Sequence, residues 1–85
     1  MYKLFYKSSI KKDVRDIPNN ELQRIMKNII SLKTDPLPIT VRKIKKGKIS
    51  FFRIRQGSYR IGYQVNFSKN EIEILFIKRR NEESY

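Results

Sequence analysis

The 85-residue chain is 39% hydrophobic and 12% aromatic, enough for one modest hydrophobic core but too little for two. It contains no cysteine and no histidine. This excludes disulfides, thiolate chemistry and Cys-ligated zinc, and it removes the side chain that most often transfers protons near neutral pH. We therefore expect one folded domain over residues 1–85 that uses no metal and no small-molecule cofactor.

The chain is strongly basic, with twenty Lys and Arg against eight Asp and Glu and a net charge of +12. Twelve of the basic residues and only two of the acidic ones fall in residues 37–80. Such an excess goes beyond what solubility requires and favours a polyanionic partner. A Lys- and Ile-rich composition that reflects genome bias or heat tolerance is the alternative explanation.

Neither the N-terminal residues nor any later segment has an apolar run long enough for a signal peptide or a membrane span. We therefore expect a cytoplasmic protein without a membrane partner.

Residues 2–6 alternate in character and are rich in β-forming side chains, which predicts a strand. A short helix follows, capped by Ser8 or Ser9 and ending before Pro18. Its apolar face repeats at spacings of four and three residues: Ile10, Val14 and Ile17.

A second helix is predicted from Glu21 to about Lys33, capped by Asn19 or Asn20. Its apolar face is formed by Leu22, Ile25, Met26, Ile29 and Leu32. Two prolines within residues 35–38 end it. The two helices therefore form an αα-hairpin.

The second half of the chain reads as four strands, at residues 41–45, 49–56, 59–65 and 71–79, with a turn at Gly47. The element order is β-α-α-β-β-β-β. Helices early and a meander late predict an α+β fold, with the helical hairpin packed on one face of an antiparallel four-strand meander.

Gly57 and Ser58 fit a two-residue hairpin turn, which fixes the pairing of the strands on either side. The expected partners are Gln56 with Tyr59, Arg55 with Arg60, and Arg53 with Gly62. On the other face Phe52 then opposes Tyr63 and Ile54 opposes Ile61, so the apolar residues gather towards the helices.

In the last hairpin, a continuous apolar face requires Ile61, Tyr63 and Val65 to pair with Phe76, Ile74 and Ile72 respectively. Arg60 then opposes Ile77, and Arg79 joins the face that already carries three arginines. The result is a cluster near one end of the sheet: Arg53, Arg55, Arg60 and Arg79. Like charges at such spacing repel unless an anion lies between them, so the register predicts a site for a polyanion.

The alternative without a binding function is that these arginines only form the solvent-exposed face of each strand. Phe51, Tyr59 and Tyr85 could stack on RNA bases near the cluster, although each could equally be a packing residue.

Three segments carry a resemblance to a known family: residues 52–55 (FRIR), 59–65 (YRIGYQV) and 78–85 (KRRNEESY). Together with the strand order, they resemble the RelE branch of the RelE/ParE toxin superfamily. The resemblance implies a type II toxin that enters the ribosomal A site and cleaves mRNA, so that translation is inhibited. It also implies attack of a ribose 2′-hydroxyl on the adjacent phosphate, and silencing by a cognate antitoxin, for which we expect an acidic amphipathic helix.

Residue by residue, the resemblance implies catalytic roles for Arg53 and Arg55 as paired basic residues, for Arg60 and Arg79, and for Tyr85. The family often has lysines at the first two positions, and arginine is a poor proton acceptor. We therefore assign Arg53 and Arg55 to phosphate binding and charge stabilisation. The general base stays open among Tyr85, the glutamates at positions 82 and 83, and the ribosome itself.

Other functions remain open on the same fold. A ParE-like inhibitor of DNA gyrase and a non-catalytic RNA-binding module are the alternatives to a nuclease. We do not expect a metal-dependent nuclease, because the acidic pairs Asp13/Asp16 and Glu71/Glu73 lie far apart in sequence and each reads as a solvated face.

Overall fold

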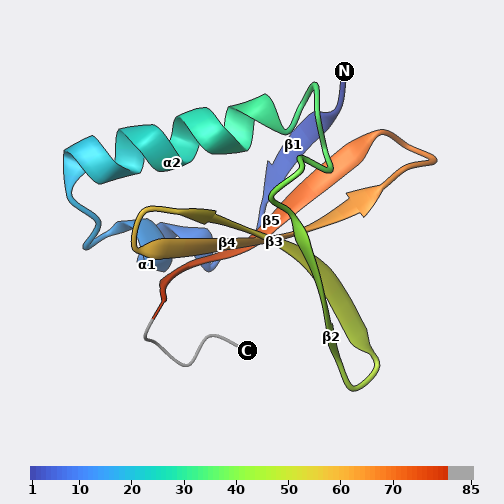
Figure 1. Ribbon diagram of the computed structural model, residues 1–85. Helices are drawn as coiled ribbons and strands as arrows, with labels where there is room; N and C mark the ends of the chain where they lie inside the picture. Colours follow the sequence, from blue (N-terminus) through green and yellow to red (C-terminus); the bar gives the residue numbers. More distant parts are fainter. Residues whose placement is uncertain (81–85) are drawn as a thin grey trace.

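The computed structural model describes residues 1–80. Its elements follow the predicted order and are shown in Figure 1. They are β1 (Lys3–Tyr6), α1 (Ile10–Val14), α2 (Asn19–Ser31), β2 (Arg42–Lys46), β3 (Ile49–Gln56), β4 (Tyr59–Asn66) and β5 (Glu71–Arg79). The α+β class and the C-terminal meander are confirmed.

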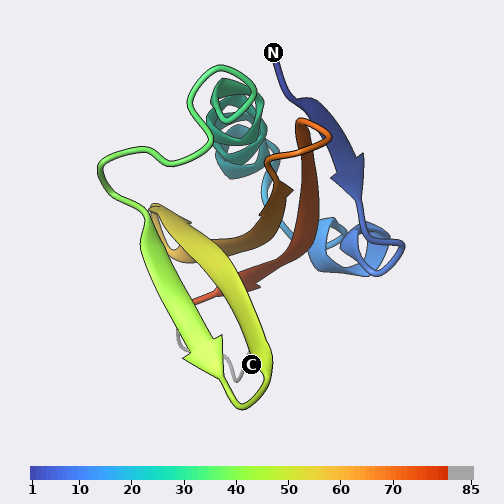
Figure 2. The same cartoon turned by 90° about the vertical axis from the view of Figure 1, so that its right-hand side faces the viewer.

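The strands form one sheet in the order β1-β5-β4-β3-β2. The last four strands are antiparallel neighbours, whereas β1 pairs in parallel with β5 as a fifth strand. Helix α2 lies across one face of this strongly twisted sheet, and the short α1 lies beside β5 (Figures 1 and 2). The place of β1 in the sheet was not predicted.

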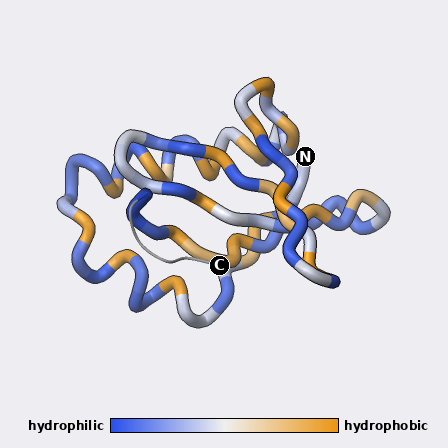
Figure 3. The backbone as a smooth tube through the Cα atoms, turned by 60° about the horizontal axis from the view of Figure 1, so that its bottom comes forward, coloured by the Kyte–Doolittle hydropathy of each residue, from blue (hydrophilic) through white to orange (hydrophobic). Residues whose placement is uncertain are grey.

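The core lies between α2 and the sheet. Ile25, Ile29 and Leu32 of the helical segment are fully buried against inward-facing strand residues such as Ile61 and Ile74. Apolar and polar residues alternate along the chain in Figure 3, as half-buried strands require. Burying one such aliphatic side chain contributes about 1.5–3 kcal/mol. The core thus fixes which side chains point to the other face.

Tyr63 connects the core to the segment after α2. Its side chain is fully buried, and its hydroxyl donates a 2.7 Å hydrogen bond to the carbonyl oxygen of Pro36. Burial, together with the negative charge of Asp35, raises the pKa of Tyr63 well above its ordinary value. The phenol therefore stays neutral and keeps donating this hydrogen bond.

The β3–β4 hairpin has the predicted register, with Gln56 paired to Tyr59 and Arg55 to Arg60. Gly57 adopts a φ of +60° at the turn, a conformation that favours glycine. The β3–β4 ladder ends at Phe52 and Tyr63. Beyond that pair, the β2–β3 hairpin leaves the sheet and projects as an arm (Figures 1 and 2).

The register of the β4–β5 hairpin was predicted only in part. Tyr63–Ile74 and Val65–Ile72 pair as expected. A β-bulge at Leu75 then shifts β5 by one residue, so that Ile61 pairs with Ile77 rather than Phe76, and Arg60 with Lys78 rather than Ile77. Residues 74–77 are all apolar, so alternation alone could not fix the phase of this strand.

The bulge places the Phe76 ring directly over Gly62 on the face away from α2. A Cβ atom at Gly62 would lie 2.2 Å from Phe76 Cε2, and the ring makes an edge contact with Phe51 at 5.6 Å between centroids. Glycine is therefore required here to admit an aromatic ring.

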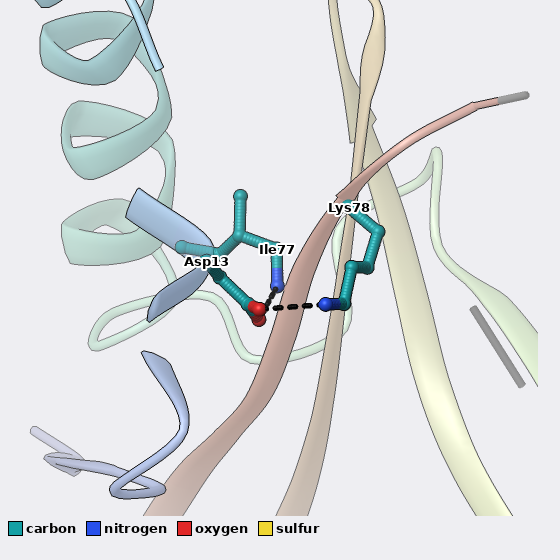
Figure 4. Close-up of polar contacts among 3 residues, drawn as sticks. All are labelled: Asp13, Ile77 and Lys78. Carbon is teal, nitrogen blue, oxygen red and sulfur yellow. Dashed lines mark hydrogen bonds and ion pairs between the residues drawn. The ribbon is translucent and has the colours of Figure 1, made fainter. Parts of the chain in front are cut away.

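A buried carboxylate joins α1 to the end of β5 (Figure 4). Asp13 accepts a 3.0 Å hydrogen bond from the Ile77 backbone N–H and forms a 2.7 Å ion pair with Lys78. Its side chain is only 4% exposed. The expectation that Asp13 belongs to a solvated face is therefore wrong, because its partner is a strand-edge N–H located where β1 no longer pairs.

Replacing Gly62 by alanine should lower the free energy of unfolding by about 1–3 kcal/mol, because the new methyl group overlaps the Phe76 ring. In a urea-denaturation cycle, Phe76→Leu should relieve much of this cost. An equal cost of Gly62→Ala with and without Phe76→Leu would contradict the packing described.

Asp13→Ala should cost about 1–3 kcal/mol of stability, because it leaves the Ile77 N–H without its acceptor. Asp13→Asn should cost less, since the amide oxygen can still accept, and the ion pair with the 36% exposed Lys78 adds little. Chemical denaturation with amide exchange at Ile77 measures both. The matched control is Asp16→Ala at an exposed position, whose free energy of unfolding should stay within about 0.5 kcal/mol of the parent value. A similar loss of stability in all three variants would refute the role of Asp13 as the acceptor for Ile77.

Candidate functional site

Arg53, Arg55 and Arg60 lie on the sheet face opposite α2, as their register predicts. Arg55 and Arg60 are direct cross-strand partners, and Arg53 is opposite Gly62. Each alternates with a buried isoleucine of the core face, Ile54 in β3 and Ile61 in β4. The expected gathering of these three arginines on one face is therefore what the structure shows.

Two arginines that sequence reasoning did not assign join this face. Arg42 of β2 is the cross-strand partner of Arg53. Arg80 follows β5, and its backbone N–H donates a 2.8 Å hydrogen bond to Ser58 O. The position of Arg42 could have been predicted from the sequence. The turn at residues 47–48 fixes the β2–β3 register in the same way that the turn at residues 57–58 fixes the β3–β4 register. We call the set Arg42, Arg53, Arg55, Arg60 and Arg80 the arginine face.

The arginine face is electrostatically strained. The pKa of the Arg55 guanidinium is lowered from its ordinary value, first by the positive charge of Arg80 and then by desolvation. Smaller effects of the same sign come from Arg53, Arg60 and Arg42. A guanidinium remains charged at neutral pH even so. An anion bound among these groups would replace repulsion by attraction.

The buried Nε–H of Arg60 lacks a hydrogen-bond acceptor within residues 1–80. A buried donor without a partner is costly. Arg60 borders a hollow of about 440 Å³ together with Ser58, Arg79 and Arg80. This hollow can admit an anionic group with acceptor oxygens.

The structure corrects the position of Arg79. Because of the bulge, Arg79 pairs with Tyr59 on the core-facing side, with its guanidinium carbon 5.7 Å from the centre of the Tyr59 ring. Arg80 takes the position on the arginine face that had been expected for Arg79. Arg79 nevertheless borders the hollow beside Arg60 at the end of the sheet.

The other expected residues divide into two groups. Phe51 and Tyr59 are 5% and 4% exposed, so they are packing residues and not available to stack on a base. Tyr85 and the two glutamates considered as general bases lie outside the described residues.

The described residues offer neither a cluster of metal ligands nor a membrane-spanning helix. Within residues 1–80, no group of three acidic side chains is placed to hold a metal ion. In the same part of the chain, no helix is long and apolar enough to cross a membrane.

Comparison with known proteins identifies the family. No family model matches the chain. A Methanocaldococcus jannaschii protein with the provisional name toxin RelE1 is 37% identical over 71 residues, covering 81% of this chain and 79% of the relative.

Solved structures agree. RelE–RelB from Pyrococcus horikoshii gives a TM-score of 0.81 at 27% identity over 95% of this chain and 97% of that one. RelB–RelE from Methanococcus jannaschii gives 0.67 at 26% identity over 89% of each chain. The RelBE2 complex of Mycobacterium tuberculosis, at TM-score 0.81 and 20% identity over 93% of this chain and 98% of that one, shares the fold. The chain belongs to the RelE branch of the RelE/ParE toxin superfamily.

Proposed function

We propose that this protein is the toxin of a type II toxin–antitoxin pair and acts as a ribosome-dependent endoribonuclease that cleaves mRNA in the A site. The observation that carries the proposal is the convergence of guanidinium groups from β3, β4 and the end of β5 on one face, with a buried Arg60 Nε that has no acceptor within residues 1–80. The relatives named above are RelE toxins, which supports the same role here.

The proposed reaction is attack of a ribose 2′-oxygen on the adjacent phosphorus. The O2′–P bond forms and the P–O5′ bond breaks, giving a 2′,3′-cyclic phosphate and a 5′-hydroxyl. One proton leaves the 2′-hydroxyl for the general base, and one is delivered to the departing O5′. Negative charge builds up on the pentavalent phosphorus, where preorganised guanidinium donors stabilise it without a metal.

The roles of individual residues follow from their positions. We assign Arg55 and Arg60 to the phosphate oxygens, because they are adjacent partners at the exposed end of the face. Arg53, 8% exposed, adds positive charge from beneath. Arg79 acts from the rim of the hollow. Tyr85 is proposed to stack on the base beside the scissile phosphate or to exchange a proton with the reacting groups.

The partners follow from charge. The basic arm formed by β2 and β3 carries Lys43, Lys45, Lys46 and Lys48, which suits contact with ribosomal RNA. The proposed antitoxin carries an acidic amphipathic helix that neutralises the arginine face. In support, the Pyrococcus and Methanococcus relatives were crystallised in complex with RelB.

Arg55→Ala and Arg60→Ala should each slow cleavage about a hundred- to a thousandfold, because loss of one such donor costs about 3–4 kcal/mol of transition-state stabilisation. Primer extension on a message under translation measures discrete A-site cuts. Arg24→Ala on α2, across the sheet from the arginine face, is the matched control and should cut at the parental rate.

An intact message together with inhibited DNA supercoiling would contradict the nuclease and favour a ParE-like gyrase inhibitor. Binding of RNA with no cuts in any sequence context would reduce the protein to a non-catalytic RNA-binding module.

A further inference from the structure

A second hollow, of about 580 Å³, lies at the opposite end of the sheet from the guanidinium groups of the arginine face. It lies at the fork where the β2–β3 arm leaves β4, beyond the last β3–β4 pair of Phe52 and Tyr63. The Gln64 side chain crosses this fork, since its Nε2 donates a 3.0 Å hydrogen bond to Ser50 O. The hollow is therefore built by the fold at a defined break in the ladder.

One wall of the hollow is a row of residues across three strands. Phe5 of β1 is the partner of Glu73 in β5, which is in turn the partner of Gln64 in β4. All three line the hollow, and Phe5 is 47% exposed. This row lies on the same sheet face as Arg60, four residues from it along β4, or about 13 Å.

The hydrogen-bonding character of this wall differs from that of the arginine face. Glu71 and Glu73 both line the hollow, and neither side chain forms an ion pair or a hydrogen bond within residues 1–80, although the protein carries a charge of +12. With its Nε2 bonded to Ser50, Gln64 is left with an acceptor oxygen and one N–H. The wall is therefore rich in acceptors, next to an exposed aromatic ring.

We propose that this hollow is a nucleobase subsite for the same RNA strand whose phosphate lies on the arginine face, an inference that rests on the proposed function. Phe5 offers a stacking surface, and Glu73 accepts a hydrogen bond from an exocyclic amino group. Adenine, cytosine and guanine carry such a group, whereas uracil presents a carbonyl oxygen in its place, which a carboxylate repels. The subsite thus selects against uridine.

Charge argues against a protein occupant. An acidic antitoxin helix would bring its own carboxylates against Glu71 and Glu73, whereas a nucleobase is uncharged and its phosphates can lie near the guanidinium groups and Lys43. A nucleotide is favoured because the face continues from these carboxylates to the guanidinium groups over a distance that about two nucleotides span.

The test compares binding of two non-cleavable probes, 2′-O-methylated hexacytidylate and hexauridylate, by fluorescence anisotropy at low ionic strength. These pyrimidines differ in the amino or carbonyl group at position 4. The parent protein should bind the cytidine probe about tenfold more tightly. Glu73→Gln should bring this ratio close to one, because an amide can serve either base.

Two variants separate specificity from general effects. Glu21→Gln on α2 removes the same charge elsewhere and should leave the ratio unchanged. Phe5→Ala, at an exposed position that does not threaten folding, should weaken both probes about tenfold and retain the preference.

A parental ratio near one, or a ratio that Glu73→Gln leaves unchanged, would overturn the subsite while leaving the nuclease proposal intact. Failure of the parent protein to bind either probe would also overturn the subsite, whereas the ribosome-dependent cleavage is judged separately by primer extension on a translated message.

Discussion

Repulsion among arginines that strand pairing holds side by side is the constraint on which the rest of the structure depends. Arg55 and Arg60 are direct cross-strand partners, an arrangement that destabilises a sheet unless other terms outweigh it. Those terms lie on the opposite face, where Ile54 and Ile61 are almost completely buried beneath α2. Because buried and charged residues alternate along each strand, the core that stabilises the fold also holds the charges together.

The charge on the sheet face opposite α2 changes sign from one end of the face to the other. Guanidinium groups gather at the end near the Gly57 turn, and carboxylates remain at the end near Asn66. Between them the Phe76 ring covers Gly62, and Arg53 lies almost fully buried beside it as the cross-strand partner of Gly62. A polyanionic strand with bases on one side suits such a surface, since its phosphate and its base edges meet groups of opposite hydrogen-bonding character.

Much of this arrangement could be predicted because it is local. The Gly57–Ser58 turn alone fixes the positions of Arg53, Arg55 and Arg60, and the hydrophobic period fixes α2. Arg79 was misplaced because residues 74–77 are apolar on both faces, so that alternation allows either phase. The structure has the phase in which a bulge places Phe76 on Gly62.

Features that depend on distant partners were not predictable from the sequence. The pairing of β1 with β5 joins residues near the two ends of the described chain, and no local sequence pattern predicts it. The acceptor role of Asp13 depends on a backbone N–H 64 residues away. The fork beside Gln64 arises because β3 and β4 diverge there. Each of these strands has an ordinary β-strand sequence, which does not predict the divergence.

The central claim is that guanidinium groups from several strands bind one phosphodiester together. Side-chain Nε resonances of ¹⁵N-arginine-labelled protein, titrated with a 2′-O-methylated RNA, test this most directly. We predict that the Arg53, Arg55, Arg60 and Arg80 signals shift along a single binding curve, while that of Arg24 stays in place. Signals that shift with separate affinities, or that move no more than that of Arg24, would contradict it.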